Sequence, residues 1–483
     1  MTVIAETQKL QQPPVFKLSF LTAMFERAGF YVLSFLIVLY AKEVYQVTDT
    51  IAFTLYAVFS ALAYLMPAAG GYLADNVLGI RRCIILGLIL EGVGLSMLYI
   101  PSKVVFPIAL AFIILGVGMF KTGPTHLLGR SYADKDPRID SGFTLYYMGM
   151  NIGSFVSALC IGEVQKYFGW RVAFLVGGVT ILLGLVWYFV FRKSAYEPDS
   201  AVGKKPLPWK IIGWVSLGLA VAGAAAMFLI SHEIVAYWVF GVATVVIFVY
   251  FIFEILRSPK EEKSKIIACL ILILMGFVFF VLYQQAYTSI LLFINRCVVR
   301  TVMGFEIPAV AFFALNPAWV IILGPILAWT YTKLGKKNKD LPVTVKFPIG
   351  LLVTTLMFFT LVASSYFTNA NYQVSAGWAV AAYFFYTLGE MLVSALGVAM
   401  VTHIAPKRMY GIMMGTWFVV GMALSSALSG VFASRASIPD TLHDPAAILA
   451  IYNHAFLEIG IAALVVTSLA FAIGPYVKRI AKL

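Results

Sequence analysis

The chain has 483 residues, of which 61% are hydrophobic and only 12% are charged. This charge content is about half that of an average soluble domain, which excludes a water-soluble globular protein. Many stretches of 18 or more residues are nearly free of charge, and a helix of that length crosses the hydrocarbon core of a bilayer. The sequence therefore predicts an all-α polytopic membrane protein.

Apolar stretches predict fourteen membrane-spanning helices. Six are expected at about 16–42, 51–75, 82–100, 104–130, 141–166 and 170–192. The segment 193–210 contains Pro, Gly and charged residues and is expected to be a loop. Two uncharged helices are expected at about 211–231 and 235–253, and six more at about 265–295, 308–333, 345–367, 374–404, 409–433 and 448–477. The first twenty residues lack the features of a signal peptide, so we expect the amino terminus to be retained.

The distribution of positive charge predicts the orientation. With the amino terminus inside, 26 of the 35 Lys and Arg residues fall on cytoplasmic connections and 7 on outer ones, while Arg27 and Lys121 lie within spans. This bias follows the positive-inside rule and places both termini in the cytoplasm. It also accounts for the net charge of +13 without a nucleic-acid partner.

A weak internal repeat predicts two six-helix halves. The turn at 70–82 (GGYLADNVLGIRR) is echoed at 324–337. Halves of this kind are typical of transporters whose substrate site lies midway between them. We therefore predict an amino-terminal bundle at 1–192, a linker with two extra spanning helices at 193–262 and a carboxyl-terminal bundle at 263–483. The residues predicted to form a conformational loop are Gly71, Asp75, Arg81 and Arg82.

Four charged side chains inside predicted spans are the strongest indicators of function. They are Glu26, Arg27, Lys121 and Glu390. A charge at the bilayer centre costs about 2.5–3.5 kcal/mol on insertion scales, so these groups should face one another or a watery cavity. Two acids and two bases sum to zero. We favour a cavity role over a purely structural set of ion pairs.

The charged residues belong to polar stripes, because residues three or four apart share one face of a helix. The first helix carries Arg27, Tyr31 and Ser34. The helix at 374–404 carries Tyr386, Glu390, Ser394 and Gly397.

Lys121 lies in a glycine-rich segment at 116–124 (GVGMFKTGP). Three glycines and a proline let another backbone approach closely and weaken the helix. An ammonium group beside such a thin wall can reach a ligand carboxylate. Packing alone explains the glycines but gives no reason for a buried lysine.

Other polar side chains near the expected mid-membrane level are Tyr64, Asn151, Gln284, Gln285, Thr288 and Asn316. For each of them a hydrogen bond between helices is favoured over contact with a ligand. Trp417 is equally consistent with a pocket wall or gate and with core packing. Glu91, Glu163 and Glu458 have no comparable polar stripe and are interpreted as structural.

The sequence contains no motif of an enzyme or a metal site. The four cysteines stand singly in apolar stretches, and His126 and His403 have no metal-ligand company. A phosphate loop and a nucleophile elbow are also absent from the sequence, so an ATPase or a hydrolase is not supported.

These motifs resemble the proton-dependent oligopeptide transporters, a branch of the major facilitator superfamily. Glu26-Arg27 with Phe30-Tyr31 resembles the E-x-x-E-R-x-x-x-Y signature of that family, and 70–82 resembles the superfamily loop between helices two and three. Further similarity lies at 116–124, 143–154, 315–317, 389–391 and 414–418. The extra helix pair is similar to that of the bacterial members, especially di- and tripeptide permeases.

The resemblance implies a major facilitator fold and symport of di- and tripeptides with protons by alternating access. It implies a monomer that needs no cofactor other than the proton gradient. Lys121 and Arg27 would hold the peptide carboxylate, and Glu390 its amino group. The peptide backbone and pocket walls would be contacted by Tyr31, Tyr64, Asn151, Gln284, Asn316, Ser394 and Trp417, and the proton-coupling residues would be Glu26, Arg27 and Glu390.

Three positions depart from the family pattern. Ala23 stands where the first signature glutamate is expected, Phe30 replaces a tyrosine, and Gln284 occupies the place of an acid found in many members. Two alternatives therefore stay open. One is a relative that carries an amino acid, nitrate or a drug-like compound, and the other is a non-transporting membrane receptor on the same fold.

Overall fold

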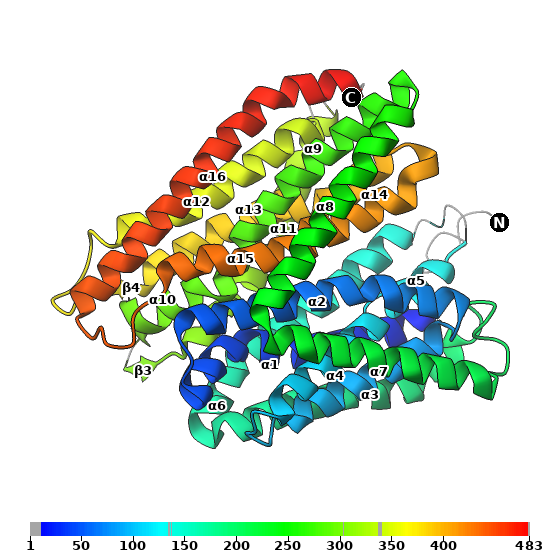
Figure 1. Cartoon of the computed structure of the whole chain (residues 1–483), viewed down its shortest axis with the longest axis horizontal. Helices are drawn as coiled ribbons and strands as arrows, with labels where there is room; N and C mark the ends of the chain where they lie inside the picture. Colours follow the sequence, from blue (N-terminus) through cyan, green and yellow to red (C-terminus); the bar gives the residue numbers. More distant parts are fainter. Residues whose placement is uncertain (1–10, 134–135, 137, 303, 337–340, 482–483) are drawn as a thin grey trace, which may run out of the picture. The chain divides into compact units, whose positions relative to one another are not determined.

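A computed structural model describes residues 11–133, 136, 138–302, 304–336 and 341–481. The described chain is almost entirely helical (Figure 1). The predicted cytoplasmic start of the chain and Lys337 of the second basic turn lie outside the described residues.

The helices of the first half, in chain order, are α1 (Val15–Tyr45), α2 (Asp49–Asn76), α3 (Ile80–Met97), α4 (Val105–Phe120), α5 (Gly123–Arg130), α6 (Ile139–Phe191) and η1 (Arg192–Ala195). The inserted pair is α7 (Trp209–Ser231) and α8 (Glu233–Arg257). The later helices are α9 (Lys260–Tyr283), η2 (Gln284–Tyr287), α10 (Ser289–Cys297), η3 (Ala309–Ala314), α11 (Leu315–Lys336), α12 (Val343–Ser364), α13 (Ala376–Ile404), η4 (Lys407–Met409), α14 (Tyr410–Thr416), η5 (Trp417–Leu424), α15 (Ser425–Ala433), η6 (Ser434–Ala436) and α16 (Pro445–Ala481).

Two small sheets join the loops of the second half. β1 (Val298–Val299) pairs in parallel with β4 (Val374–Ser375), with Val298 opposite Val374. β2 (Thr301–Val302) pairs antiparallel with β3 (Phe305–Glu306), with Thr301 opposite Glu306.

The predicted helix pattern agrees with the structure. Twelve continuous helical stretches among the described residues are long and apolar enough to span a membrane. One of them, α6, is two helices joined at Gly169, whose φ of 79° interrupts the helical path. The 18-residue α3 carries Arg81, Arg82 and Glu91, which take it outside that set. If α3 is counted as a span and α6 as two spans, the number of spans is compatible with the fourteen predicted.

The described chain divides into two compact units. Unit 1 contains residues up to Leu33 and Leu65–Phe228, and unit 2 contains Ser34–Tyr64 and Leu229–Leu483. The end of α1, the start of α2 and the helix α8 therefore belong with the carboxyl-terminal helices. These boundaries differ from the predicted domains at 1–192, 193–262 and 263–483, which stay a prediction about how the bundles are delimited.

In unit 1, α3 packs against both α4 and α6, and glycines allow the close approach. A Cβ atom on Gly70 of α2 would lie 1.8 Å from the carbonyl oxygen of Gly118 in α4. A Cβ on Gly153 of α6 would lie 2.2 Å from the carbonyl oxygen of Met24 in α1. Only glycine fits where two helix backbones touch in this way.

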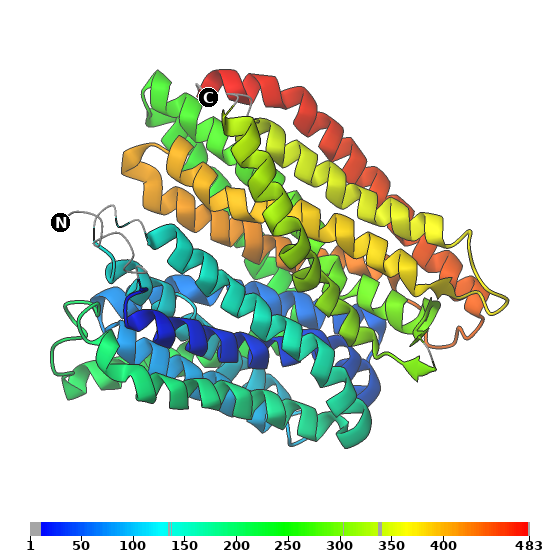
Figure 2. The ribbon, with the colours of Figure 1, turned by 180° about the vertical axis from the view of Figure 1, so that it is seen from behind.

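In unit 2, α12 packs against α9, α13 and α16, and Figures 1 and 2 show α9, α12 and α16 side by side. The inserted helices are peripheral to these bundles. In the most apolar 18-residue stretch of each helix, only 6% is buried in α7 and 11% in α8. This low burial fits helices that present most of their surface to lipid.

A buried carboxylate fixes residues 34–64 within unit 2. Asp49, at the start of α2, has no exposed surface and accepts two hydrogen bonds from the Arg296 guanidinium, at 2.6 and 2.9 Å. The Lys42 ammonium lies 2.9 Å from Asp49 and 3.0 Å from Asp440, and the Ile438 N–H donates to Asp49 at 3.0 Å. Asp49 therefore joins α1, α2, α10 and the segment before α16.

Replacing Asp49 by Asn should lower the stability of the protein far more than the same change at Asp440. Asp49→Asn leaves the partly buried Arg296 without its counter-charge, a loss on the order of 3–5 kcal/mol. Asp440 is 59% exposed at its side chain, so Asp440→Asn should cost less than about 1 kcal/mol. Thermal unfolding of both purified variants in detergent measures the difference. Equal midpoints would show that the Asp49 pair does not hold these elements together.

Candidate functional site

The first cluster of buried charge lies in unit 1 on α1. The Arg27 Nε donates to Glu26 Oε2 at 2.6 Å, and the same guanidinium forms an ion pair with the other carboxylate oxygen. Glu26 has no exposed surface. The guanidinium carbon of Arg27 also lies 4.6 Å from the ring centre of Phe30 and 5.9 Å from that of Tyr31. Two neighbours in the sequence thus neutralise each other, and aromatic faces cover the cation.

Lys121 joins this cluster from the end of α4. The helix stops at Phe120, and Lys121 and Thr122 form a turn before α5 begins at Gly123, as the glycine-rich segment predicted. Arg27, Glu26 and Glu91 are the charged groups that interact electrostatically with the Lys121 ammonium. The structure therefore brings together three of the four predicted intramembrane charges.

Sequence reasoning missed the fourth member of the cluster, Glu91 of α3. Its side chain has no exposed surface, and neither carboxyl oxygen has a hydrogen-bond partner among the described residues. Its electrostatic neighbours are Glu26, Arg27 and Lys121. A Cβ atom on Gly116 would lie 2.5 Å from the Glu91 backbone nitrogen, so the glycine lets α4 approach α3 at this point. The only sequence signal was an acid inside an apolar span.

The second cluster lies in unit 2 and centres on Glu390 of α13. Asn316 of α11 donates to Glu390 at 2.7 Å and to Thr387 at 3.1 Å, and the Tyr283 hydroxyl donates to Glu390 at 3.3 Å. Tyr283 stacks on Tyr386 with ring centres 4.6 Å apart. The predicted stripe of Tyr386 and Glu390 on α13 is therefore held by residues from two other helices, α9 and α11. These hydrogen-bond donors are neutral and leave the charge of Glu390 uncompensated.

Gln284 lies in a buried hydrogen-bond network of unit 2. It is 1% exposed and accepts from the Tyr56 hydroxyl at 3.2 Å, while its amide donates to Ser60 at 3.1 Å and to Ser426 at 2.7 Å. These bonds join α2 to η2 and α15 within unit 2. The network is neutral and well satisfied, so Gln284 acts here as a bond between helices, the alternative that the sequence favoured.

Four further predicted site residues share an intermediate exposure. Tyr31, Tyr64, Asn151 and Ser394 are half-buried. The Asn151 amide donates to the Tyr147 carbonyl of its own helix at 2.9 Å.

Trp417, at the start of the π-helical segment η5, has no exposed surface. Cβ atoms on Gly276 and Gly397 would lie 2.4 and 1.9 Å from its ring. Phe280 and Phe347 meet the ring edge-on, with ring centres 6.0 and 6.1 Å away. Its predicted role in the pocket wall stays a prediction, because in this structure the ring is packed inside unit 2.

The predicted conformational loop is bound to the segment that follows α6. The buried Asp199 carboxylate accepts from Arg81 Nε at 2.6 Å and from the Ile80 N–H at 2.9 Å. It thereby caps the amino-terminal end of α3, where Gly79 offers no side chain. Arg82 donates to the Lys205 carbonyl at 2.6 Å. The segment at 199–205 is therefore fastened to the turn between α2 and α3.

The other two loop residues lie at the end of α2. Asp75 is exposed and lies 3.7 Å from His126 Nδ1 of α5. Gly71 is half-buried and faces Thr122, with 3.7 Å between its ideal Cβ position and the threonine hydroxyl.

Comparison with known proteins identifies the family. The model of the POT family matches residues 81–445, which is most of the chain. The chain belongs to the POT family. It is 35% identical to dipeptide and tripeptide permease A of Serratia proteamaculans over 97% of this chain and 92% of that protein. It is also 35% identical to dipeptide and tripeptide permease B of Salmonella typhimurium over 99% of this chain and 98% of that protein.

Solved structures of POT transporters share the fold. The crystal structure of tetrameric PepTSo2 has a TM-score of 0.88 and 32% identity, covering 97% of this chain and 99% of that one. A bacterial homologue of the human drug peptide transporters PepT1 and PepT2 has a TM-score of 0.86, 32% identity and the same coverage. The predicted major facilitator fold and the predicted family are confirmed.

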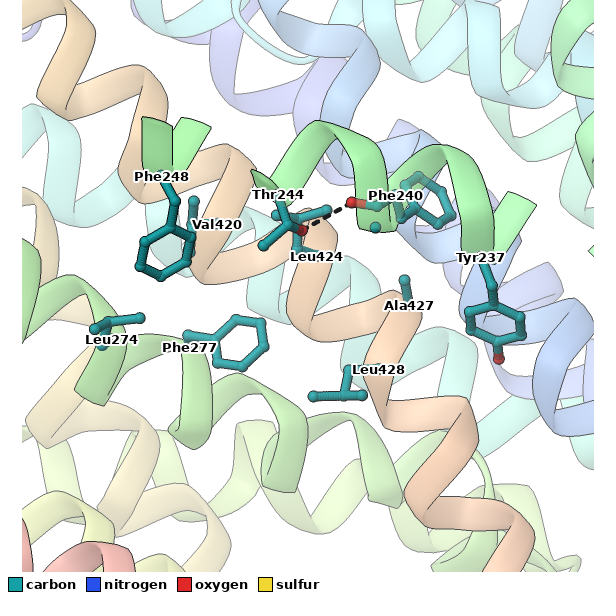
Figure 3. A pocket seen from close by; sticks show the side chains of 11 residues that line it. Tyr237, Phe240, Thr244, Phe248, Leu274, Phe277, Val420, Leu424, Ala427 and Leu428 are labelled. Carbon is teal, nitrogen blue, oxygen red and sulfur yellow. Dashed lines mark hydrogen bonds between the residues drawn. The ribbon is translucent and has the colours of Figure 1, made fainter. Parts of the chain in front are cut away.

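A cavity of about 460 Å³ lies in unit 2 beside the inserted helix α8 (Figure 3). Tyr237, Phe240, Thr244 and Phe248 of α8 line one wall. The others are lined by Leu274 and Phe277 of α9 and by Val420, Leu424, Ala427 and Leu428 of η5 and α15. The Thr244 hydroxyl is turned back to the Phe240 carbonyl at 2.8 Å. No charged residue lines this cavity, so it cannot neutralise the ends of a zwitterion.

Removing the negative charge of Asp199 should detach the segment at 199–205 from the turn between α2 and α3. In Asp199→Asn the ion pair with Arg81 is lost, and the exposed Lys204 should become more accessible to trypsin. Glu197→Gln is the matched control, because Glu197 is exposed in the same segment. The rate of cleavage in this segment, followed by electrophoresis and mass spectrometry, should rise several-fold in Asp199→Asn alone. Equal rates in the two variants would contradict the proposed anchoring.

Proposed function

We propose that this chain is a proton-coupled symporter that imports di- and tripeptides across the bacterial inner membrane by alternating access. The observation that carries the proposal is a pair of charge clusters inside the spans of a POT-family chain. One cluster contains Lys121 and Arg27 together with acidic residues, and the other contains the single acid Glu390. The relatives at 35% identity bear the names of dipeptide and tripeptide permeases.

A free peptide is a zwitterion, so its recognition requires groups of both signs. In the proposal, Lys121 and Arg27 bind the carboxylate of the peptide, and Glu390 binds its amino group. Neutral donors around Glu390 support this role, because they orient the carboxylate without cancelling its charge. The peptide backbone and the pocket walls are assigned to Tyr31, Tyr64, Asn151, Gln284, Asn316, Ser394 and Trp417.

Proton coupling is assigned to Glu26, Arg27 and Glu390. Protonation of Glu26 removes the negative partner of Arg27, and protonation of Glu390 removes its attraction for an ammonium group. Either event changes the ion pairs of the site and thereby favours the change from the outward-facing to the inward-facing conformation. One proton crossing 100 mV is worth about 2.3 kcal/mol, enough for roughly fifty-fold accumulation of the peptide. No cofactor beyond this gradient enters the proposal.

The remaining parts of the proposal concern placement and assembly. The bias of positive charge supports cytoplasmic positions for both termini. A monomer is proposed as the working unit, as the resemblance to the family implies. Sedimentation of the purified protein in detergent distinguishes a monomer from a tetramer like that of PepTSo2.

Uptake by proteoliposomes tests the function directly. Labelled dialanine and trialanine should accumulate under an imposed pH gradient and inside-negative voltage, and dialanine should compete where alanine and nitrate do not. Uptake of nitrate or alanine instead would support the alternative of a non-peptide solute. Binding of dialanine without any flux would support a receptor.

Capped peptides should show which end of the substrate each charge binds. In the wild type, dialanine should compete for uptake better than dialanine amide and better than N-acetyl-dialanine. Lys121→Gln should abolish the advantage over the amide, and Glu390→Gln the advantage over the acetylated peptide, because each variant removes one counter-charge. Each loss corresponds to about 1.5–3 kcal/mol, or roughly 10- to 100-fold in competition. The ratios are independent of expression level, and unchanged ratios in both variants would refute the two assignments.

The coupling assignment is tested with Glu26→Gln and Glu390→Gln. Both should keep exchange of labelled for unlabelled peptide, to the extent that they still bind it, and both should lose accumulation driven by the pH gradient. Accumulation against a gradient in both variants would show that neither carboxyl group carries the proton.

A further inference from the structure

Glu91 is a buried carboxyl group to which the proposed function gives no role. It lies in the middle of α3 and has no exposed surface, and its two oxygens lack hydrogen-bond partners among the described residues. An ionised carboxylate in such a place loses its hydration without receiving donors in return. A native fold retains such a group at a cost in stability, and buried acids within membrane spans commonly serve in proton transfer.

The charged groups that act on Glu91 come from α1 and from the end of α4. From α1, Glu26 and Arg27 act on its charge, and Lys121 does so from the end of α4. On α6, Tyr146 is buried and interacts with Glu26 and Arg27.

The other charged groups on α3 and α5 lie elsewhere, and one of them, Arg130 at the end of α5, is exposed. Arg81 and Arg82 at the start of α3 bind Asp199 and the Lys205 carbonyl. His126 of α5 lies by Asp75. Glu91 and the three groups that act on it, Glu26, Arg27 and Lys121, are therefore two acids and two bases.

The two acids of this set differ in the hydrogen bonds that their carboxyl oxygens accept. Glu26 accepts hydrogen bonds from Arg27 on both of its oxygens, and bonds between a guanidinium and a carboxylate are charge-assisted. Glu91 accepts no hydrogen bond from the described residues, as is the case for a carboxyl group in an apolar pocket. The oxygens of Glu91 are therefore the carboxyl oxygens of this cluster to which no described side chain donates a hydrogen bond.

We propose that Glu91 takes up a proton when a peptide carboxylate binds at Lys121 and Arg27. The inference rests on the proposed function. With all four side chains ionised the cluster is neutral, and an incoming carboxylate makes it negative by one charge. One proton from water then forms an O–H bond on Glu91 and restores neutrality, with no other bond made or broken. Peptide binding and proton binding thus favour each other, which is the thermodynamic requirement of symport.

Proton uptake on peptide binding measures this coupling without any transport. Purified full-length protein in weakly buffered detergent solution is mixed with dialanine, and a pH indicator reports the protons taken up, while calorimetry reports the binding. The wild type should take up protons, and its affinity for dialanine should fall by up to about tenfold for each unit of rising pH. Glu91→Gln should bind dialanine with reduced proton uptake and a flatter dependence on pH.

Glu458→Gln is the matched control. Glu458 is an exposed acid of α16 that pairs at 3.6 Å with His454, and its loss should leave proton uptake unchanged. Wild-type proton uptake in Glu91→Gln would overturn the inference, and so would an equal loss in the control. If the wild-type protein binds no dialanine, the proposed function fails first and is recognised separately.

A spectroscopic measurement keeps the inference testable if Glu91→Gln does not fold. The infrared difference spectrum of the wild type with and without dialanine should gain the band of a protonated carboxyl group. Glu91→Asp should shift this band, since the aspartic acid group has a different environment and chain length. A wild-type spectrum without the band, or a band that Glu91→Asp leaves in place, would contradict the assignment.

Discussion

The need to neutralise charge away from water governs both clusters of this transporter. A charge within the hydrocarbon layer costs several kcal/mol unless an opposite charge or well-placed dipoles compensate it. Unit 1 uses opposite charges, with Arg27 bound to Glu26 and Lys121 close by. Unit 2 uses dipoles, with Asn316 and Tyr283 donating to Glu390. An ion pair is neutral before any ligand arrives, whereas a carboxylate held by neutral donors keeps its charge and still attracts a cation.

Close backbone contact makes the cluster in unit 1 geometrically possible. Gly116 lets α4 approach α3 beside Glu91, and Gly118 meets Gly70 of α2. The helix then stops at Phe120, so Lys121 lies at a carboxyl-terminal helix end and its N–H reaches the Val117 carbonyl. A positive charge is favoured at that end of a helix dipole. The glycines and the lysine thus serve one purpose, since the former bring the acid close and the helix end stabilises the base.

Sequence alone gave the helices and the local charge pairs but not the distant ones. Long apolar stretches locate the spans because only helices of that length satisfy their backbones in lipid. Glu26 and Arg27 are neighbours, so their pairing is visible in the sequence. The glycines and proline around Lys121 predicted a weakened helix within one span at 104–130, whereas α4 ends at Phe120 and α5 begins at Gly123. Asp199 with Arg81, and Asp49 with Arg296, are 118 and 247 residues apart and carry no mark of their pairing. Glu91 has no polar stripe on its own helix, and the groups that act on it lie on α1 and at the end of α4, so the sequence of α3 alone does not indicate its role.

The composition of the unit 1 cluster bears on the altered signature at Ala23. The resemblance to the family leads one to expect a glutamate there, and its absence suggested that fewer groups remain to carry protons. Ala23 is buried on α1, where a carboxyl group beside Glu26 would add a third acid to two bases. With alanine at this position, Glu26 and Glu91 balance Arg27 and Lys121. If Glu91 takes up a proton as proposed, α3 adds a proton-accepting acid to Glu26 of α1, so the alanine at this position does not by itself imply the loss of coupling.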